Sequence, residues 1–331
     1  MLTDTHIESM AGLFAKNLTS IRNLNGYHNY IYEVCGNRTF ILRISKDDNL
    51  DATNCEIDFL RYLYKNGCPV APPVLSLQKK YVHLVNIDEK SYAVSAYKKA
   101  VGKDWRTRGI DGRERLIIIG RILGKMHKLS MQYKPCNRKR RRQWDESPHI
   151  VKAPGIFVRY NENLLEKFNY YMSRMRKFPK NKDSFGLVHG DFLFSNYFFD
   201  ENNRISVFDF DECEYSWYIY DIAVCMYYYL LGGRPKELDS KAKEAEEMFY
   251  HILLGYISEC ELDMDCLRNM NLFFQLREYV LLSSVLEASM NNLNGWNKDF
   301  VEGAIDRILT GKPFINVDFE EIYNKVARDK L

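Results

Sequence analysis

The pattern of apolar and polar positions divides the chain into two regions. In the first hundred residues the apolar positions form short runs of β-branched and aromatic side chains, which predict strands over residues 30–35, 39–44, 81–87 and 91–97. Gly36-Asn37 supplies a favourable hairpin turn between the first two runs. Ile57, Leu60 and Leu63 instead recur at helical spacing, so one helix is expected among these strands.

Beyond Gly102 the apolar positions recur mainly at helical spacing. The pattern predicts helices over residues 116–129, 164–175, 241–257 and 269–290. One β-rich island, residues 187–211, lies between them. We therefore expect an α+β fold of two lobes, with a β-rich N-lobe over 1–97, a connector over 98–103 and a mostly helical C-lobe over 104–331.

The β-rich island carries the residues that indicate chemistry. Asp191 and Asn196 have the spacing D-x-x-x-x-N in LVHGDFLFSN, and Asp209 follows in VFDFD. Residues 197–199 and 205–208 are expected to pair as a hairpin, which returns Asp209 to the vicinity of Asn196. Phosphoryl transfer to a hydroxyl needs a carboxylate beside that hydroxyl and hard oxygen ligands for a magnesium ion. Either acid alone is explained as an ordinary loop residue, but the spacing, the hairpin and the apolar flanks together favour a phosphoryl-transfer site.

The same residues carry a family resemblance. His189-Gly190-Asp191, Asn196 and Asp209 resemble the signature of the aminoglycoside phosphotransferase and choline kinase superfamily. The stretches FDFDECEYSWYIYDIA and LRE look most like those of its type II homoserine kinase-like members. The resemblance implies a bilobal, protein-kinase-like fold, in agreement with the predicted lobes.

The resemblance also implies how the site residues act. Asp191 is then the catalytic base or the group that orients the acceptor hydroxyl. Asn196 and Asp209 are the metal ligands. His189 and Asp221 are structural residues near the site, and Asp221 binds the backbone of the catalytic loop.

The nucleotide-binding residues are identified mainly by the same resemblance. Gly26 and Asn29, in NGYHNY, look like the superfamily's reduced phosphate loop, and Glu56 matches its helix glutamate. Arg43 stands where a lysine is expected, and a guanidinium can bridge Glu56 and phosphate. Lys46 is the alternative phosphate ligand, and Arg43 is then an outward strand charge.

The connector is expected to bind the base of the nucleotide. Backbone groups of Ala96 and Tyr97 would meet adenine there, as the resemblance implies. The implied cofactors are ATP and Mg²⁺, and the choice between ATP and GTP stays open.

Acidic and aromatic side chains crowd the chain after the metal motif, at Asp211, Glu212, Glu214, Tyr215, Trp217 and Tyr218. Acidic residues beside aromatic side chains suit a cationic amine, through ion pairing and cation–π contact. The alternative is that the aromatic side chains belong to the core. We therefore expect Asp211, Glu212 and Trp217 to contact the acceptor, although Asp211 fits the metal shell or a solvated position equally well. Arg277 either receives a substrate carboxylate or pairs with Glu278 or another acid.

These residues predict a phosphotransferase that moves the γ-phosphate of ATP to a hydroxyl of a small, amine-bearing molecule. An amino alcohol, a hydroxy amino acid such as homoserine, or an aminoglycoside would fit. One alternative is a Ser/Thr protein kinase of the stress-response type, although no long activation segment follows Asp209. The other is a non-catalytic kinase-fold nucleotide-binding or scaffold protein, against which the presence of Asp191, Asn196 and Asp209 argues.

Composition excludes several other classes. The net charge of +3 over 331 residues is too mild to indicate nucleic-acid binding. The basic run Arg138–Arg142 is expected to be a solvated loop or helix end, with a phosphate or acidic partner as the alternative. No apolar run approaches the roughly 18 residues that span a bilayer, and the N-terminus lacks the features of a secretion signal, so we expect a cytoplasmic protein without a membrane partner. The expected partners are a nucleotide and a small-molecule acceptor, and the oligomeric state stays open.

Overall fold

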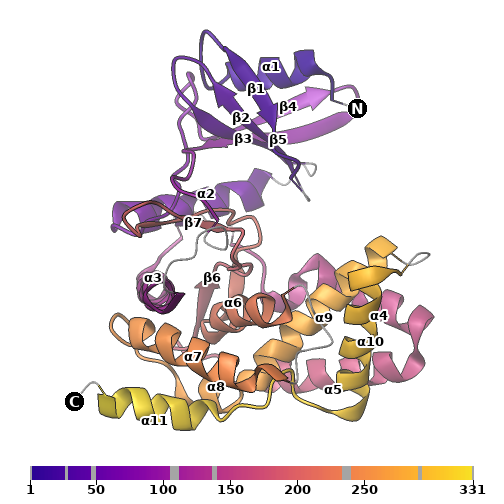
Figure 1. The fold of residues 1–331 in the computed structure, drawn as a ribbon. Helices are drawn as coiled ribbons and strands as arrows, with labels where there is room; N and C mark the ends of the chain where they lie inside the picture. Colours follow the sequence, from indigo (N-terminus) through magenta and orange to yellow (C-terminus); the bar gives the residue numbers. More distant parts are fainter. Residues whose placement is uncertain are drawn as a thin grey trace. The chain divides into compact units, whose positions relative to one another are not determined.

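The chain folds into two compact units (Figure 1). The computed structural model describes residues 2–26, 29–45, 50–104, 112–135, 140–232, 240–289 and 293–329. Unit 1 comprises Met1–Trp105, Tyr133–Arg141 and Tyr197–Asp211, and unit 2 comprises Arg106–Gln132, Arg142–Asn196 and Glu212–Leu331. The expected N-lobe and connector thus lie in unit 1, and two segments from the expected C-lobe join them there.

Unit 1 is built on a five-stranded antiparallel sheet in the order β1-β2-β3-β5-β4. Its strands are β1 (Ser20–Asn23), β2 (Tyr30–Cys35), β3 (Phe40–Ile44), β4 (Val82–Ile87) and β5 (Lys90–Tyr97). The four strands expected from the sequence correspond to β2, β3, β4 and β5. The sequence does not predict β1, because SIRN contains a single apolar residue and leaves most of its length exposed.

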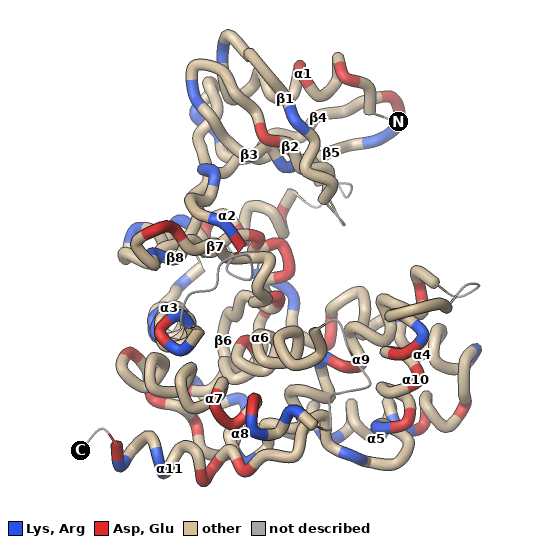
Figure 2. The backbone as a smooth tube through the Cα atoms, viewed as in Figure 1, with Lys and Arg blue, Asp and Glu red and all other residues tan. Residues whose placement is uncertain are grey.

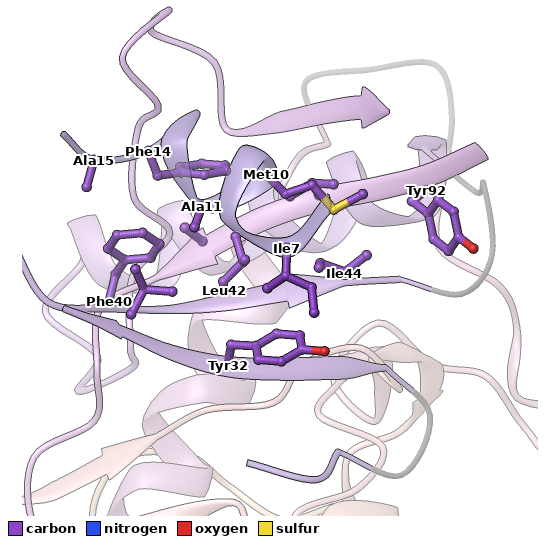
Figure 3. Packing of buried hydrophobic residues seen from close by; sticks show 13 residues of the cluster. Ile7, Met10, Ala11, Phe14, Ala15, Tyr32, Phe40, Leu42, Ile44 and Tyr92 are labelled. Carbon is purple, nitrogen blue, oxygen red and sulfur yellow. The ribbon is translucent and has the colours of Figure 1, made fainter. Parts of the chain in front are cut away.

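Helix α1 (Asp4–Gly12) packs on this sheet and closes its main core. Thr3 caps the helix by accepting a hydrogen bond from the backbone N–H of His6. Figure 3 shows apolar side chains of α1 and the following turn meeting those of the strands; they are Ile7, Met10, Ala11 and Phe14 against Tyr32, Phe40, Leu42, Ile44 and Tyr92. Burial of these side chains is the main stabilising contribution to the sheet.

Helix α2 (Leu50–Lys65) and a small hairpin complete unit 1. The helix contains the predicted apolar repeat and packs through Ile57 against Val82 and Ala93. The hairpin consists of β7 (Tyr197–Phe199) and β8 (Ile205–Val207), as the sequence predicts. The hairpin comes late in the sequence but belongs to unit 1. The backbone N–H of Ala71 donates to the carbonyl of Val207 at 2.8 Å and so connects the hairpin to that unit.

Unit 2 is mostly helical. Its helices are α3 (Gly112–Gln132), α4 (Pro148–Tyr160), α5 (Glu162–Lys177), α6 (Ile219–Leu231), α7 (Ala242–Tyr256), α8 (Met264–Arg268), α9 (Met270–Ser289), α10 (Gly295–Thr310) and α11 (Phe319–Asp329), with a 3₁₀ turn at Trp144–Glu146. The strands β6 (Phe185–Val188) and β9 (Glu214–Trp217) pair antiparallel. Helices α4, α5, α9 and α10 pack together, and α7 lies beside α3 and α11 (Figure 1).

The four helices predicted from the sequence are α3, α5, α7 and α9. Helix α6 escapes the helical pattern because it is buried on almost every side, so its apolar positions show no one-sided period. Residues of both charge signs occur in each of the helices α5, α7 and α11 (Figure 2). In the part of the chain that the structure describes, no helix has the length and apolar character needed to cross a membrane.

Helices α3 and α7 cross so closely that glycine is required at the crossing. A Cβ atom on Gly120 would lie 1.8 Å from the carbonyl oxygen of Ile252, and one on Gly255 would lie 1.9 Å from that of Ile117. Both contacts are with backbone, which cannot move aside as a side chain can. The two glycines therefore set the distance between these helices.

We expect Gly120→Ala to destabilise the protein by about 3 kcal/mol, because the added methyl group must push the α3 and α7 backbones apart. Gly155→Ala is the matched control, since Gly155 lies inside α4 with open space around its Cα. This second change should stabilise the protein by about 0.5–1 kcal/mol through helix propensity. Chemical denaturation followed by circular dichroism measures both values, and equal stabilities of the two variants would contradict the close crossing.

Candidate active site

The catalytic loop of unit 2 begins directly after β6 with a glycine that no other residue can replace. Gly190 has φ of +79°, and a Cβ atom there would lie 2.5 Å from the carbonyl oxygen of Glu212. The left-handed backbone and the close contact both exclude a side chain. The turn at Gly190 therefore fixes the direction in which the chain presents Asp191.

Asp221 holds this loop by its backbone. The carboxylate of Asp221, in the first turn of α6, is fully buried and accepts the backbone N–H groups of His189 and Gly190, each at 2.8 Å. The ring of His127 in α3 lies 3.1 Å from the same carboxylate through Nε2, and its Nδ1 lies 3.0 Å from the hydroxyl of Tyr256. This placement is the one that a structural residue beside the loop requires, as expected for Asp221 and for the buried His189.

Asp191 has a hydrogen-bond donor on each carboxylate oxygen. Asn196 Nδ2 donates to Oδ2 of Asp191 at 3.1 Å and to its backbone carbonyl at 2.9 Å, and Arg277 Nη2 donates to Oδ1 at 2.5 Å. The Asp191 side chain nevertheless keeps 23% of its surface exposed. The carboxylate is thus fixed in orientation and still accessible to a substrate.

Asn196 is oriented so that its amide oxygen faces away from this hydrogen-bond pair. Because Nδ2 is engaged by Asp191, Oδ1 is the free end of the amide; within the protein it accepts a 3.3 Å hydrogen bond from Ser195 Oγ. An amide oxygen is a hard ligand of the kind that magnesium prefers.

Unit 1 contains a cavity of about 320 Å³ that has the residues expected for nucleotide binding. Its walls are largely apolar, with contributions from Leu24, Ile31, Ile41, Leu60, Phe198 and Phe208. Arg43, Glu56, Tyr97 and Asp209 line the same cavity. An apolar pocket with a few charged groups at one side suits a nucleotide base and its phosphates.

Arg43 and Glu56 form a buried ion pair in this cavity. Arg43 Nη2 donates to Glu56 Oε2 at 2.6 Å, and the hydroxyl of Tyr97 donates to Glu56 Oε1 at 3.1 Å. Burial opposes the charge of Arg43, but the Glu56 carboxylate and the Tyr97 side chain keep its pKa well above the ordinary value. Arg43 therefore points inward, and the alternative of an outward strand charge is wrong; Lys46 lies outside the described residues.

Asp209 has an unusual backbone conformation. Its φ is +67°, in the left-handed region that non-glycine residues seldom adopt. Such strain persists where the surrounding structure imposes it and is concentrated at functional sites. The hairpin pairs Tyr197 with Val207, so the chain enters the hairpin from Asn196 and leaves it towards Asp209. Their sharing of one magnesium ion stays a prediction.

The phosphate loop is connected to the residue that follows the metal motif. Asn29 Nδ2 donates to Asp211 Oδ2 at 2.9 Å. A Cβ atom on Gly26 would be 2.5 Å from the carbonyl oxygen of Asn29. Tyr27 and His28, between these residues, lie outside the described residues.

The end of β5 and the segment that follows it border the cavity of unit 1. Ala96 is a fully buried residue of β5, and its carbonyl accepts the backbone N–H of Val74 at 2.7 Å. The contact of Ala96 with adenine stays a prediction. Tyr97, Lys98, Lys99 and Ala100 line the cavity.

Comparison with known proteins assigns the chain to a family. A sequence model of the phosphotransferase enzyme family matches residues 20–249. The amicoumacin kinase of Bacillus subtilis (strain 168) is 31% identical over 311 residues, which cover 91% of this chain and 90% of that protein. The chain belongs to the phosphotransferase enzyme family.

Solved structures resemble this phosphotransferase over nearly its whole length. The amicoumacin kinase hAmiN, in complex with AMP-PNP, Ca²⁺ and Ami, has a TM-score of 0.88 at 26% identity, with 97% of each chain covered. A microcompartment-associated aminopropanol kinase has a TM-score of 0.72 at 20% identity, covering 93% of this chain and 98% of that chain, and this likeness concerns the fold alone. The predicted α+β, protein-kinase-like fold, the superfamily and the activity of a kinase on a small molecule are thereby confirmed.

Two glutamates of the acidic stretch share one arginine within unit 2. Arg142 forms ion pairs with both Glu212 and Glu214, the second at 3.2 Å. Trp217 is fully buried and donates from Nε1 to the carbonyl of Pro179 at 2.7 Å. Four aromatic rings surround Trp217, those of Trp144, Phe178, Phe185 and Phe273. The expectation that Trp217 contacts the acceptor is therefore wrong, because this side chain belongs to the core.

Two residues of the basic run, Arg141 and Arg142, are part of the folded structure, whereas Arg140 is exposed. Arg141 is buried in unit 1 and donates to the carbonyl oxygens of Ala52, at 3.1 Å, and of Asp211. Arg141 thus links α2 to the segment that carries the metal motif. The expectation of a solvated loop is wrong for Arg141 and Arg142, while Arg138 and Lys139 lie outside the described residues.

We expect Glu56→Gln to raise the KM for ATP at least tenfold and to destabilise the protein by about 3–5 kcal/mol, because it leaves the buried charge of Arg43 without its partner. Lys152→Gln is the control, since it breaks the exposed Lys152–Glu287 pair, whose contribution should be below about 1 kcal/mol. Steady-state kinetics and denaturation provide the measurements. A Glu56→Gln variant that matches the control in both would contradict the proposed position of Arg43 and Glu56 in the nucleotide site.

Proposed function

We propose that this phosphotransferase transfers the γ-phosphate of ATP to a hydroxyl group of amicoumacin or of a closely related amine-bearing small molecule. The observation that carries the proposal is the fixed yet accessible carboxylate of Asp191, in a chain that is 31% identical to an amicoumacin kinase over 91% of its length. The structure of hAmiN with AMP-PNP, Ca²⁺ and Ami supports both the nucleotide and the divalent metal.

Asp191 is proposed to orient the acceptor hydroxyl. Its carboxylate retains free lone pairs beside the hydrogen bonds from Asn196 and Arg277, and one of them accepts the hydroxyl proton. Because the transition state of phosphoryl transfer is loose, holding the attacking oxygen in line contributes more than removing its proton early. A carboxylate held on both oxygens is suited to that task.

The nucleotide is proposed to bind in the cavity of unit 1. The apolar walls would contact the base, and the Arg43 guanidinium, kept in place by Glu56, would contact phosphate oxygens. Asn196 and Asp209 would hold a magnesium ion, which neutralises charge on the phosphate oxygens. In the described part of the chain no three side chains of His, Cys, Asp or Glu gather into a metal site, in keeping with an ion that takes its other ligands from phosphate and water.

The acceptor specificity rests on the relatives rather than on the acidic cluster. Glu212 and Glu214 share the single cation of Arg142, so their attraction for an amine is weakened by that pairing. Asp211 remains a candidate contact for the amine, with Asn29 as its neighbour. A protein kinase activity is not proposed, because β9 begins at Glu214, and only Glu212 and Cys213 separate it from Asp211.

We expect Asp191→Ala to lower turnover of the true acceptor by two or more decades, the usual contribution of a positioned general base. The acceptor itself is identified by an ATP-consumption screen with amicoumacin, 1-amino-2-propanol, homoserine, spectinomycin and a generic protein substrate. Each positive result is repeated with GTP. Turnover of amicoumacin that persists in the Asp191→Ala variant would remove the proposed base, and turnover of the protein substrate alone would remove the small-molecule acceptor.

We expect Asp209→Ala to raise the Mg²⁺ concentration for half-maximal activity at least tenfold, since it removes the carboxylate ligand. Asp200→Ala is the matched control, because Asp200 lies at the tip of the same hairpin and pairs with Arg204. That control should leave the Mg²⁺ requirement unchanged. A titration of activity with Mg²⁺ after treatment with EDTA makes the comparison, and equal requirements in the two variants would disprove a metal site at Asp209.

A further inference from the structure

Arg277 lies on helix α9 and contacts the catalytic loop. Its Nη2 atom donates to Asp191 Oδ1 at 2.5 Å and to the hydroxyl of Tyr228, and its Nη1 atom donates to the carbonyl of Gly190 at 3.4 Å. The guanidinium carbon lies 4.7 Å from the centre of the Tyr228 ring. One side chain thus contacts the backbone of the loop and its carboxylate together.

We infer that Arg277, held by Tyr228, is a positioning residue that sets the orientation of the Asp191 carboxylate for phosphoryl transfer. This inference rests on the proposed function, since it assumes that Asp191 meets the acceptor hydroxyl. Arg277 then acts through Asp191 and does not bind the acceptor. Tyr228 fixes Arg277 in turn, through its hydroxyl and through its ring.

The burial of Arg277 argues for a specific purpose. Only 9% of its side-chain surface is exposed, and its Nε atom has no hydrogen-bond partner among the described residues. Burying a guanidinium with an unsatisfied N–H costs free energy, which an Asp191–Arg277 pair at the surface would not incur. A buried N–H without a protein partner calls for an explanation, and a role at the neighbouring Asp191 supplies one.

A neighbouring pair shows what a purely structural arrangement looks like in the same helix. Glu278, the next residue, pairs with Arg307 at 2.5 Å, and the exposed fractions of these side chains are 3% and 9%. Both ends of that pair are enclosed. In the Arg277 pair the acidic end, Asp191, keeps 23% of its surface open, so the fixed carboxylate is presented outward.

Two physical effects follow from this contact. Arg277 on Oδ1 and Asn196 on Oδ2 restrict rotation of the Asp191 carboxylate, so a hydroxyl meets an acceptor atom that is already oriented. The guanidinium also offsets the repulsion between the Asp191 carboxylate and an approaching anionic phosphate. Both effects change kcat more than ground-state binding, because they act on the attacking oxygen in the transition state.

We expect Arg277→Met to lower kcat about 100-fold while the KM values for ATP and acceptor stay within about threefold. Arg277→Lys should retain about a tenth of the activity, since it keeps the charge but loses the two-armed contact. Added guanidinium at low, non-denaturing concentration should restore activity to Arg277→Ala. Tyr228→Phe should lower kcat about tenfold. This variant tests the same contact if the arginine variants fold poorly.

Arg307→Met is the matched control, because it breaks the buried pair one residue away without touching Asp191. It should lower the unfolding midpoint and leave kcat of the folded enzyme within about twofold. In the double variant Asp191→Ala/Arg277→Met we expect no loss beyond that of Asp191→Ala, since residues that act as a unit are not additive.

Three results would overturn the inference. A rise in acceptor KM with unchanged kcat in Arg277→Met would make Arg277 a substrate ligand. A kcat like that of Arg307→Met would make its role structural only. If the kcat of the double variant fell by the product of the two single losses, Arg277 would not act through Asp191. By contrast, normal turnover in Asp191→Ala alone would overturn the proposed function, so the two failures are distinguishable.

Discussion

The catalytic loop depends on a single buried carboxylate, that of Asp221. A fully buried acid is unfavourable unless its oxygens are satisfied. Here the backbone N–H groups of His189 and Gly190 and the ring of His127 satisfy them. The Asp221 carboxylate accepts these hydrogen bonds from the backbone of the loop. A shift of the loop would therefore leave a buried carboxylate without its hydrogen-bond donors. These hydrogen bonds therefore tie the loop conformation to the core of unit 2.

A second side chain, the positively charged Arg277, also holds the loop. Helix α6 supplies the carboxylate of Asp221 to the loop backbone, and α9 supplies the guanidinium of Arg277 to the carboxylate of Asp191. The two helices pack against each other, so both contacts are fixed by the same core. Burial opposes the charge of Arg277, but the Tyr228 and Asp191 side chains keep its pKa well above the ordinary value. The Arg277 guanidinium therefore carries its charge although it is buried.

The sequence predicts those parts of the molecule that local spacing determines. Four strands of the sheet, the hairpin after Asn196 and the ion pair of Arg43 with Glu56 follow from periodicity, turn residues and motif positions. Helix α6 does not follow from the sequence, because a helix buried on all sides has no one-sided apolar pattern. The partner of Arg277 does not follow either, because tertiary packing decides which acidic residue pairs with a distant arginine. For the same reason the basic run gives no sign that Arg141 joins α2 to Asp211.

The acidic and aromatic stretch after the metal motif explains why composition is a weaker guide to function than spacing. Glu212 and Glu214 are acidic in the sequence, yet both pair with Arg142, and Trp217 is aromatic, yet it lies in the core. Charge and aromatic content are properties of single residues, and a partner far away in the sequence can cancel either. The spacing of Asp191 and Asn196 is a property of the backbone, and no distant residue can change it. The reaction follows from that spacing, whereas the acceptor follows from the whole surface around the site, which relatives that share the full fold describe better than any local run of residues.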